Sequence, residues 1–132
     1  QCFSGFTSHN ILLFIIHIIE ASHNTDIFAA EIVLRLRGEG HDIRLICASP
    51  YEGFENKWSE EWQTRYNKIL NDADIIRFIS PGYSSLCFQD RNKWMIQHSS
   101  KVIAVYNGET GGTKNTIALA RKAGIAVSII KG

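Results

Sequence analysis

Short apolar runs alternate along this chain with segments that repeat apolar residues at helical spacing. Most of the runs are continuously apolar, which is typical of strands covered on both faces, as in a parallel sheet. The predicted strands are Cys2–Ser4, Ile43–Ala48, Ile75–Ser80, Val102–Tyr106 and Ile125–Ile130. The run Ile11–Ile19 (ILLFIIHII) is predicted to be one more buried strand or helix. It is far shorter than the ~20 residues that a membrane-spanning helix needs.

Between the runs, three segments show the apolar stripe of an amphipathic helix. The predicted buried positions, helix by helix, are Ala29, Ile32, Val33 and Leu36; Trp58, Trp62, Tyr66 and Ile69; and Ile117, Ala120 and Ala123. Gly38 and Gly124 are placed to end the first and third helices, and Ser59 or Asn56 to begin the second. Strand–helix–strand repetition predicts an α/β protein with a three-layer Rossmann-like fold, in which helices flank a mostly parallel sheet.

Composition narrows the class of protein. The 132 residues are predicted to form a single domain, 1–132, with 45% apolar and 20% charged residues. The net charge of +1 argues against a large nucleic-acid surface. The three cysteines show no metal-ligand spacing and no disulfide framework, so we expect a cytoplasmic protein without a metal. No Lys or Arg precedes the Ile11–Ile19 run, which argues against a signal peptide.

The residues that follow each strand matter most, because ligands of open α/β sheets bind beyond the carboxyl ends of the strands. Gly111-Gly112-Thr113 precedes a helix predicted to begin near Lys114. A helix N-terminus attracts phosphate, and glycines let the backbone approach it closely. The alternative is a tight turn with a threonine cap, and on this motif alone the alternative is favoured.

Two further residues have a binding and a structural interpretation. Arg91 could pair with a phosphate or carboxylate in two-pronged geometry, or it could belong to a solvated helix start. Tyr51, directly after a strand, could stack on a base. Asp26 and Glu31 are five residues apart on one helix, so they do not share a face and make a poor acid/base pair.

Four spaced groups of residues carry a resemblance to a known family. They are Asp26 with Ala29-Ala30-Glu31, Pro50-Tyr51-Glu52, Arg91-Asn92 with Met95, and Gly111-Gly112-Thr113 with Thr116. Through them, residues 26–130 closely resemble the YpsA-like family, a branch of the SLOG superfamily. That superfamily also holds the LOG-type phosphoribohydrolases and the DprA-type DNA-processing proteins. The resemblance implies a Rossmann-like fold with a nucleotide-type ligand at the strand ends.

The resemblance also implies which residues form the site. Gly112 and Thr113 would hold phosphate, Arg91 would face the ligand, and Asp26 would lie near a ribose. The full predicted set of ligand-binding residues is Gly5, Asp26, Pro50, Tyr51, Arg91, Asn92, Gly111, Gly112, Thr113 and Thr116. No catalytic residue and no metal ligand is predicted.

The sequence departs from its relatives in two places. Residues 21–25 contain no glycine, and the stretch from Gly5 to Asp26 is shorter than the resemblance implies. Either a helix and a strand are lost there or residues are missing from this N-terminal part. The LOG-type hydrolases carry a glutamate in the helix turn that here reads Lys114 to Ala118. Glycosidic cleavage usually needs such an acid or base within hydrogen-bond reach.

The sequence therefore favours a nucleotide-binding or sensing module without turnover of its own, with a nucleotide or an ADP-ribose-like molecule as ligand. The alternatives are a nucleoside-monophosphate phosphoribohydrolase and a DprA-like single-stranded DNA binder, the latter disfavoured by the net charge. The Ile11–Ile19 run and the three tryptophans exceed what one small core readily hides. We therefore expect a homodimer that buries a helix face, which light scattering would test.

Overall fold

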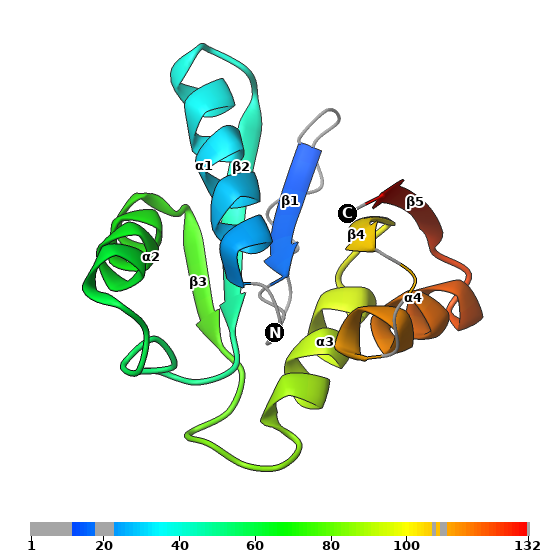
Figure 1. The fold of residues 1–132 in the computed structure, drawn as a ribbon. Coiled ribbons are helices and arrows are strands. Elements are labelled where there is room, and N and C mark those ends of the chain that lie inside the picture. The colour runs from blue at the N-terminus through cyan, green and yellow to red at the C-terminus, as the bar shows by residue number, and fades with distance from the viewer. Residues whose placement is uncertain (1–11, 18–22, 107, 109–110, 132) are drawn as a thin grey trace.

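A computed structural model describes residues 12–17, 23–106, 108 and 111–131 of the chain (Figure 1). Its elements follow one another as alternating strands and helices. They are β1 (Leu12–His17), α1 (His23–Gly38), β2 (Ile43–Ser49), α2 (Glu60–Asp72), β3 (Ile75–Phe78), α3 (Cys87–Gln97), β4 (Lys101–Tyr106), α4 (Gly112–Lys122) and β5 (Ala126–Lys131). The run Ile11–Ile19 thus supplies a strand, and the strand predicted at Cys2–Ser4 lies outside the described residues.

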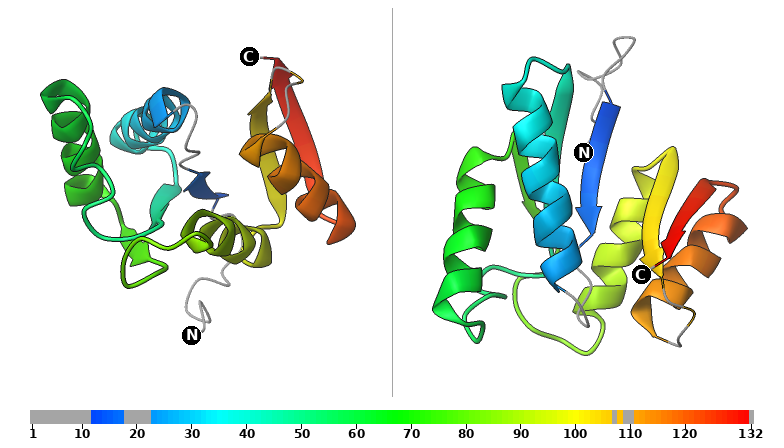
Figure 2. Two further views of the ribbon diagram at one scale, coloured as in Figure 1. Left: turned by 60° about the horizontal axis from the view of Figure 1, so that its bottom comes forward. Right: turned by 45° about the horizontal axis from the view of Figure 1, so that its top comes forward.

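The strands form two small sheets in which every pair is parallel. β1, β2 and β3 lie side by side in that order, with Leu12 opposite Ile43 and Ile46 opposite Ile75. β4 pairs with β5, and Lys101 lies opposite Ala126. The arrows of both sheets point toward the same edge of the molecule (Figure 2, right). The predicted α/β class with parallel strands and flanking helices is therefore confirmed, with the strands shared between two sheets.

Helices cover both faces of the three-stranded sheet. α1 and α2 lie on one face and α3 on the other (Figure 2, left). α3 also packs against α4, and α4 packs against β4 and β5. α3 is therefore the element that joins the two halves of the fold.

The main core lies between α1, α2 and the first sheet. It consists of Ile27, Ala30, Val33, Ile43, Leu45, Cys47, Tyr66 and Ile69. The other face of β2 is buried as well, since Ile46 and Ala48 are fully covered. β2 thus matches the prediction of burial on both faces.

The apolar stripe predicted for α1 is partly wrong. Val33 is buried as expected, but Ala29 and Ile32 face outward, and Ile27 and Ala30 take their places in the core. α1 carries apolar residues at most positions around its axis, so helical spacing alone fits more than one face. Phe28 and Ile32, four residues apart, remain exposed on one face. A homodimer would need such a face, and it stays a prediction.

The burial predicted for the last two strands is also wrong. α4 packs on one face of the β4–β5 sheet. Ile103, Val105 and Ile130 are exposed. Ile103 and Val105 are two residues apart on β4, and Ile130 lies opposite Val105, so they share the other face. A continuous apolar run therefore marks these strands correctly without implying that both faces are covered by the described part of this chain.

The helix ends agree better with their predicted signals. Ser59 is the N-cap residue of α2, as predicted, although its side chain makes no capping hydrogen bond. Tyr66 and Ile69 of that helix are buried. Gly124 follows α4 with a φ of 77°, the left-handed conformation that makes glycine favourable after a helix.

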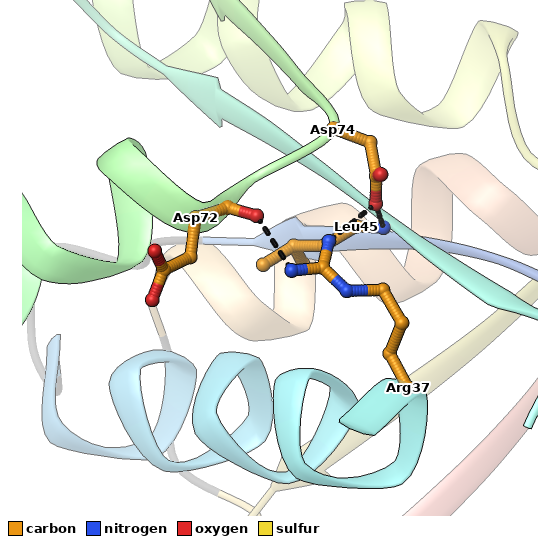
Figure 3. Close-up of polar contacts among 4 residues, drawn as sticks. All are labelled: Arg37, Leu45, Asp72 and Asp74. Atoms are coloured by element: carbon orange, nitrogen blue, oxygen red, sulfur yellow. Dashed lines mark hydrogen bonds and ion pairs between the residues drawn. The ribbon is translucent and has the colours of Figure 1, made fainter. Parts of the chain in front are cut away.

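A polar brace ties three elements together at the amino ends of the strands (Figure 3). One carboxylate oxygen of Asp74 accepts hydrogen bonds from the Leu45 backbone N–H at 2.8 Å and from Arg37 Nη1 at 2.9 Å. Arg37 Nη2 also donates to the backbone oxygen of Asp72 at 2.9 Å. The brace therefore links the end of α1 to β2 and to the connection between α2 and β3.

We expect the substitution Asp74→Ala to destabilise the fold. It leaves the backbone N–H of the buried Leu45 without its acceptor and Arg37 without its ion pair, at a cost of about 1–3 kcal/mol in the free energy of unfolding. The matched control is Asp72→Ala, because Arg37 contacts the main chain of Asp72 and that contact survives. Urea unfolding of both variants measures the difference, and equal losses would show that the brace contributes nothing special.

Candidate functional site

The candidate site lies where the strands end. The carboxyl ends of β1 and β4 and the N-termini of α1, α3 and α4 gather at one edge of the molecule (Figure 2, right). We call this region the strand-end edge. Helix N-termini present backbone N–H groups that have no partner within their own helix, together with a partial positive charge. The arrangement therefore favours an anionic ligand.

The N-terminus of α4 has a glycine at its N-cap position. This residue is Gly111, whose φ of 146° is accessible mainly to glycine and which has no side chain to form a capping hydrogen bond. Thr116, which is buried, donates its hydroxyl proton to the Gly112 carbonyl oxygen at 2.9 Å. Thr113 is therefore not the N-cap residue, and the helix begins two residues earlier than predicted.

The charges in the first turn of α4 are unusual for a helix start. The turn contains no acidic residue, and Lys114 lies in it with an exposed side chain. A positive charge at this end of a helix is unfavourable in isolation, because it faces the positive end of the dipole. A bound anion between Lys114 and the helix end would remove that conflict.

Arg91 is not part of a solvated helix start, because its residue is only 1% exposed. α3 begins at Cys87, and Cys87, Arg91 and Met95 follow one another at intervals of four along its buried face. Arg91 Nε donates to the Asn92 Oδ1 atom at 2.9 Å, and its guanidinium carbon lies 5.9 Å from the centroid of the Phe88 ring. Arg91 thus brings a positive charge into the interior beside the strand-end edge.

Buried polar groups gather at the end of β2. The Ser49 hydroxyl donates to the Tyr51 backbone oxygen at 3.3 Å and lies 2.9 Å from the Tyr66 hydroxyl, which must then be the donor to Ser49. The pKa of Tyr66 is raised to about 12, mainly by burial. The hydrogen bond with Ser49 and the charge of Arg91 lower this pKa, whereas the Glu55 carboxylate raises it. Glu55 and Arg91 therefore act on the same hydroxyl with opposite sign.

Glu55 has an oxygen whose hydrogen bonding is incomplete. Its Oε2 atom is buried and has no hydrogen-bond partner in the part of the chain that the structure describes. A buried carboxylate oxygen usually accepts a hydrogen bond from protein, water or ligand. Glu55 thus places an acceptor beside the buried end of β2.

Aromatic rings continue from this point to the surface. Edge-to-face contacts join Trp58 to Tyr66 and to Phe54, with ring centroids 5.2 Å apart in each pair. Phe54 contacts Tyr51 and Phe88, each with a centroid separation of 5.7 Å. Tyr51 and Phe88 both reach Tyr83. The cluster connects the buried end of β2 to the loop before α3.

The two acidic residues of α1 have different surroundings. Asp26 lies in the first turn of the helix and is buried, so it is held near the strand-end edge. Glu31 accepts hydrogen bonds from Arg65 of α2, and Arg65 also lies over the rings of Phe28 and Trp62. Glu31 is therefore engaged between helices and not at the edge.

Nine of the ten predicted site residues fall within the described chain, and Gly5 lies outside it. The structure places Asp26 on α1, Pro50 and Tyr51 after β2, Arg91 and Asn92 on α3, and Gly111, Gly112, Thr113 and Thr116 at the start of α4. Contacts link Tyr51 to Phe88 of α3 by way of Phe54, and α3 packs on α4. Ser49, Glu55 and Tyr83 are not among the predicted site residues, although each lies at the end of a strand or in the loop after one.

Charge is distributed unevenly along the chain. Residues 87–132 contain seven Lys or Arg against two Asp or Glu, whereas residues 1–86 contain seven against eleven. Lys93, Lys114, Arg121 and Lys122 are exposed on α3 and α4. The basic part of the chain therefore includes both helices that border the predicted phosphate position.

Within the described residues, no group of three or more His, Cys, Asp or Glu side chains could hold a metal ion. Cys47 and Cys87 are buried free thiols, and burial raises the pKa of Cys47 to about 12. None of the helices in the described ranges is both long and apolar enough to cross a membrane.

Comparison with known proteins identifies a family that this chain matches. The model of the YpsA family, described as a SLOG family, matches residues 12–124. A UPF0398 protein of Staphylococcus haemolyticus is 28% identical over 116 residues, covering 83% of this chain and 62% of the relative. The SPbeta prophage-derived protein YoqJ of Bacillus subtilis is 33% identical over 110 residues, covering 74% of this chain and 64% of YoqJ. A UPF0398 protein of Brevibacillus brevis is 30% identical over 98 residues, covering 73% of this chain and 52% of the relative. The chain thus spans between half and two thirds of the length of these relatives.

Proposed function

The chain belongs to the YpsA family of SLOG proteins, and from this premise we propose that it is a nucleotide-binding module. In this proposal the ligand phosphate lies at the N-terminus of α4 and the remainder of the nucleotide lies along the strand-end edge. The ligand is a nucleotide or a nucleotide derivative such as ADP-ribose.

The observation that carries the proposal is the glycine at the N-cap position of α4. Gly111 brings the backbone into the helix without a side chain, and the first turn of α4 contains no acidic residue. Lys114 adds a positive charge at the same end of the helix. Exposed N–H groups, a positive dipole end and a lysine are together what a phosphate requires.

The buried positions of Arg91 and Asp26 support the proposal in a different way. Both are charged residues buried near the strand-end edge, and buried charged groups at such an edge are candidates for a functional site. We assign to Arg91 the stabilisation of ligand charge from within and to Asp26 the binding of ribose hydroxyls. Tyr51, half-buried in the loop after β2, is assigned to the same site.

A panel of ligands in thermal unfolding tests the function. We expect at least one of NAD, ADP-ribose, a cyclic dinucleotide or a nucleoside monophosphate to raise the melting temperature. A ligand at 100 times its dissociation constant adds about 2.7 kcal/mol to the free energy of unfolding. Adenosine and inorganic sulfate serve as controls for the base alone and for an anion alone. A melting temperature that no nucleotide raises would rule out the proposed function.

Glu55 supports a second candidate, a nucleoside-monophosphate phosphoribohydrolase. The first turn of α4 lacks a carboxylate, but the buried Oε2 atom of Glu55 places one near the end of β2. A carboxylate could support glycosidic cleavage if it reached the substrate. Release of free base from nucleoside monophosphates, abolished by Glu55→Gln, would establish this activity, whereas binding without release would favour a sensing module.

A further inference from the structure

The loop between β3 and α3 exposes an aromatic ring at the strand-end edge. Tyr83 is 74% exposed, and Phe78 and Leu86 at the two ends of the same connection are exposed as well. A contiguous exposed apolar patch usually marks a binding surface, and an exposed aromatic ring in a strand-end loop is a candidate part of one. The connection runs beneath the ends of β2 and β3 and leads into α3 (Figure 1).

The ring of Tyr83 is held in place by other rings. It stands at 84° to Tyr51, with centroids 6.2 Å apart, and at 68° to Phe88, with centroids 6.5 Å apart. Phe88 lies 5.9 Å from the guanidinium carbon of the buried Arg91. An exposed ring supported in this way loses little conformational freedom when a flat molecule stacks on it.

We propose that Tyr83 stacks on the base of the nucleotide, so that its ring is the base-binding surface of the site. This inference rests on the proposed function, because it needs a nucleotide whose phosphate lies at α4. Loop residues Ser80, Ser84 and Ser85 lie on both sides of Tyr83, and their hydroxyls suit the polar edge of a base better than an acyl chain. Stacking tolerates any base, since every base has a π-face.

Calorimetric titration with AMP and with ribose 5-phosphate separates the base from the phosphate. Base stacking on an aromatic side chain contributes about 1–3 kcal/mol, so we expect Tyr83→Ala to weaken AMP binding about tenfold or more. The affinity for ribose 5-phosphate should not change, because that molecule has no base. Tyr83→Phe keeps the ring and should bind AMP as the unsubstituted protein does. Phe28→Ala, which removes an exposed ring from α1, is the matched control and should leave both affinities unchanged.

The outcomes distinguish this inference from the function on which it rests. Suppose that the unsubstituted protein binds AMP and ribose 5-phosphate. If Tyr83→Ala then binds each compound as tightly as the unsubstituted protein does, the stacking role is overturned while phosphate binding stands. Equal affinity of the unsubstituted protein for AMP and ribose 5-phosphate would overturn it too, because the base would then contribute nothing. If neither compound binds, both the stacking role and a nucleoside-monophosphate site are excluded.

Discussion

Gly112→Asp is expected to abolish nucleotide binding while leaving the fold nearly intact. Gly112 is the first residue of α4, and the substitution puts a carboxylate where the ligand phosphate would lie. Like charges brought together cost several kcal/mol, so the affinity should fall by about 100-fold or more. The helix should tolerate the change, because an acidic residue in the first turn is favourable by about 0.3–1 kcal/mol.

The backbone conformation makes this prediction sharper. The left-handed φ at the helix entrance belongs to Gly111, whereas Gly112 is not among the glycines with positive φ. A side chain at position 112 therefore meets no strain from a positive φ. Any loss of binding must come from the side chain's charge or bulk.

Two control variants separate charge from bulk. Gly112→Ala adds a methyl group without charge and should lose less affinity than the aspartate. Ala118→Asp places the same charge on an exposed position further along α4 and should leave affinity unchanged. Calorimetric titration of the three variants with the most stabilising nucleotide of the panel decides the matter. Equal affinity of Gly112→Asp and the unsubstituted protein would remove this glycine from the site.

Patterns that depend on local sequence could be predicted from the chain. Parallel strands follow from the continuous apolar runs, and the helix ends follow from Ser59 and Gly124. The position of Gly111 and Gly112 at the start of a helix can also be predicted from nearby sequence, because an apolar strand precedes them and the apolar stripe of a helix follows. Predicting these features does not require knowing which elements pack against them.

Features that depend on packing could not be predicted in the same way. The apolar residues of α1 fit more than one face, and only contact with β2 and α2 selects Ile27 and Ala30 for the core. Arginine usually lies at the protein surface. The spacing of four from Cys87 and from Met95 nevertheless places Arg91 on the buried face of α3. Glu55 and Tyr83 become candidate site residues only in the folded protein, because the fold brings their loops near Arg91.

Replacing Arg91 should separate its contribution to folding from its contribution to binding. Arg91→Ala removes the largest of the fully buried side chains and should cost about 2–5 kcal/mol in the free energy of unfolding. Arg91→Met keeps most of the volume without the charge, so it creates a smaller cavity than the alanine. The methionine variant should therefore lose less stability than Arg91→Ala.

The binding behaviour of Arg91→Met then reports the role of the charge. A buried cation acts on a nearby anion with little screening by solvent, so its removal should weaken nucleotide binding about tenfold, roughly 1.4 kcal/mol. Met95→Ala, one turn further along the same buried face, is the matched control. It should lower stability as a core truncation does and leave the affinity unchanged. If Arg91→Met binds the nucleotide as tightly as the unsubstituted protein, Arg91 serves packing alone, and the phosphate is held by the start of α4 without it.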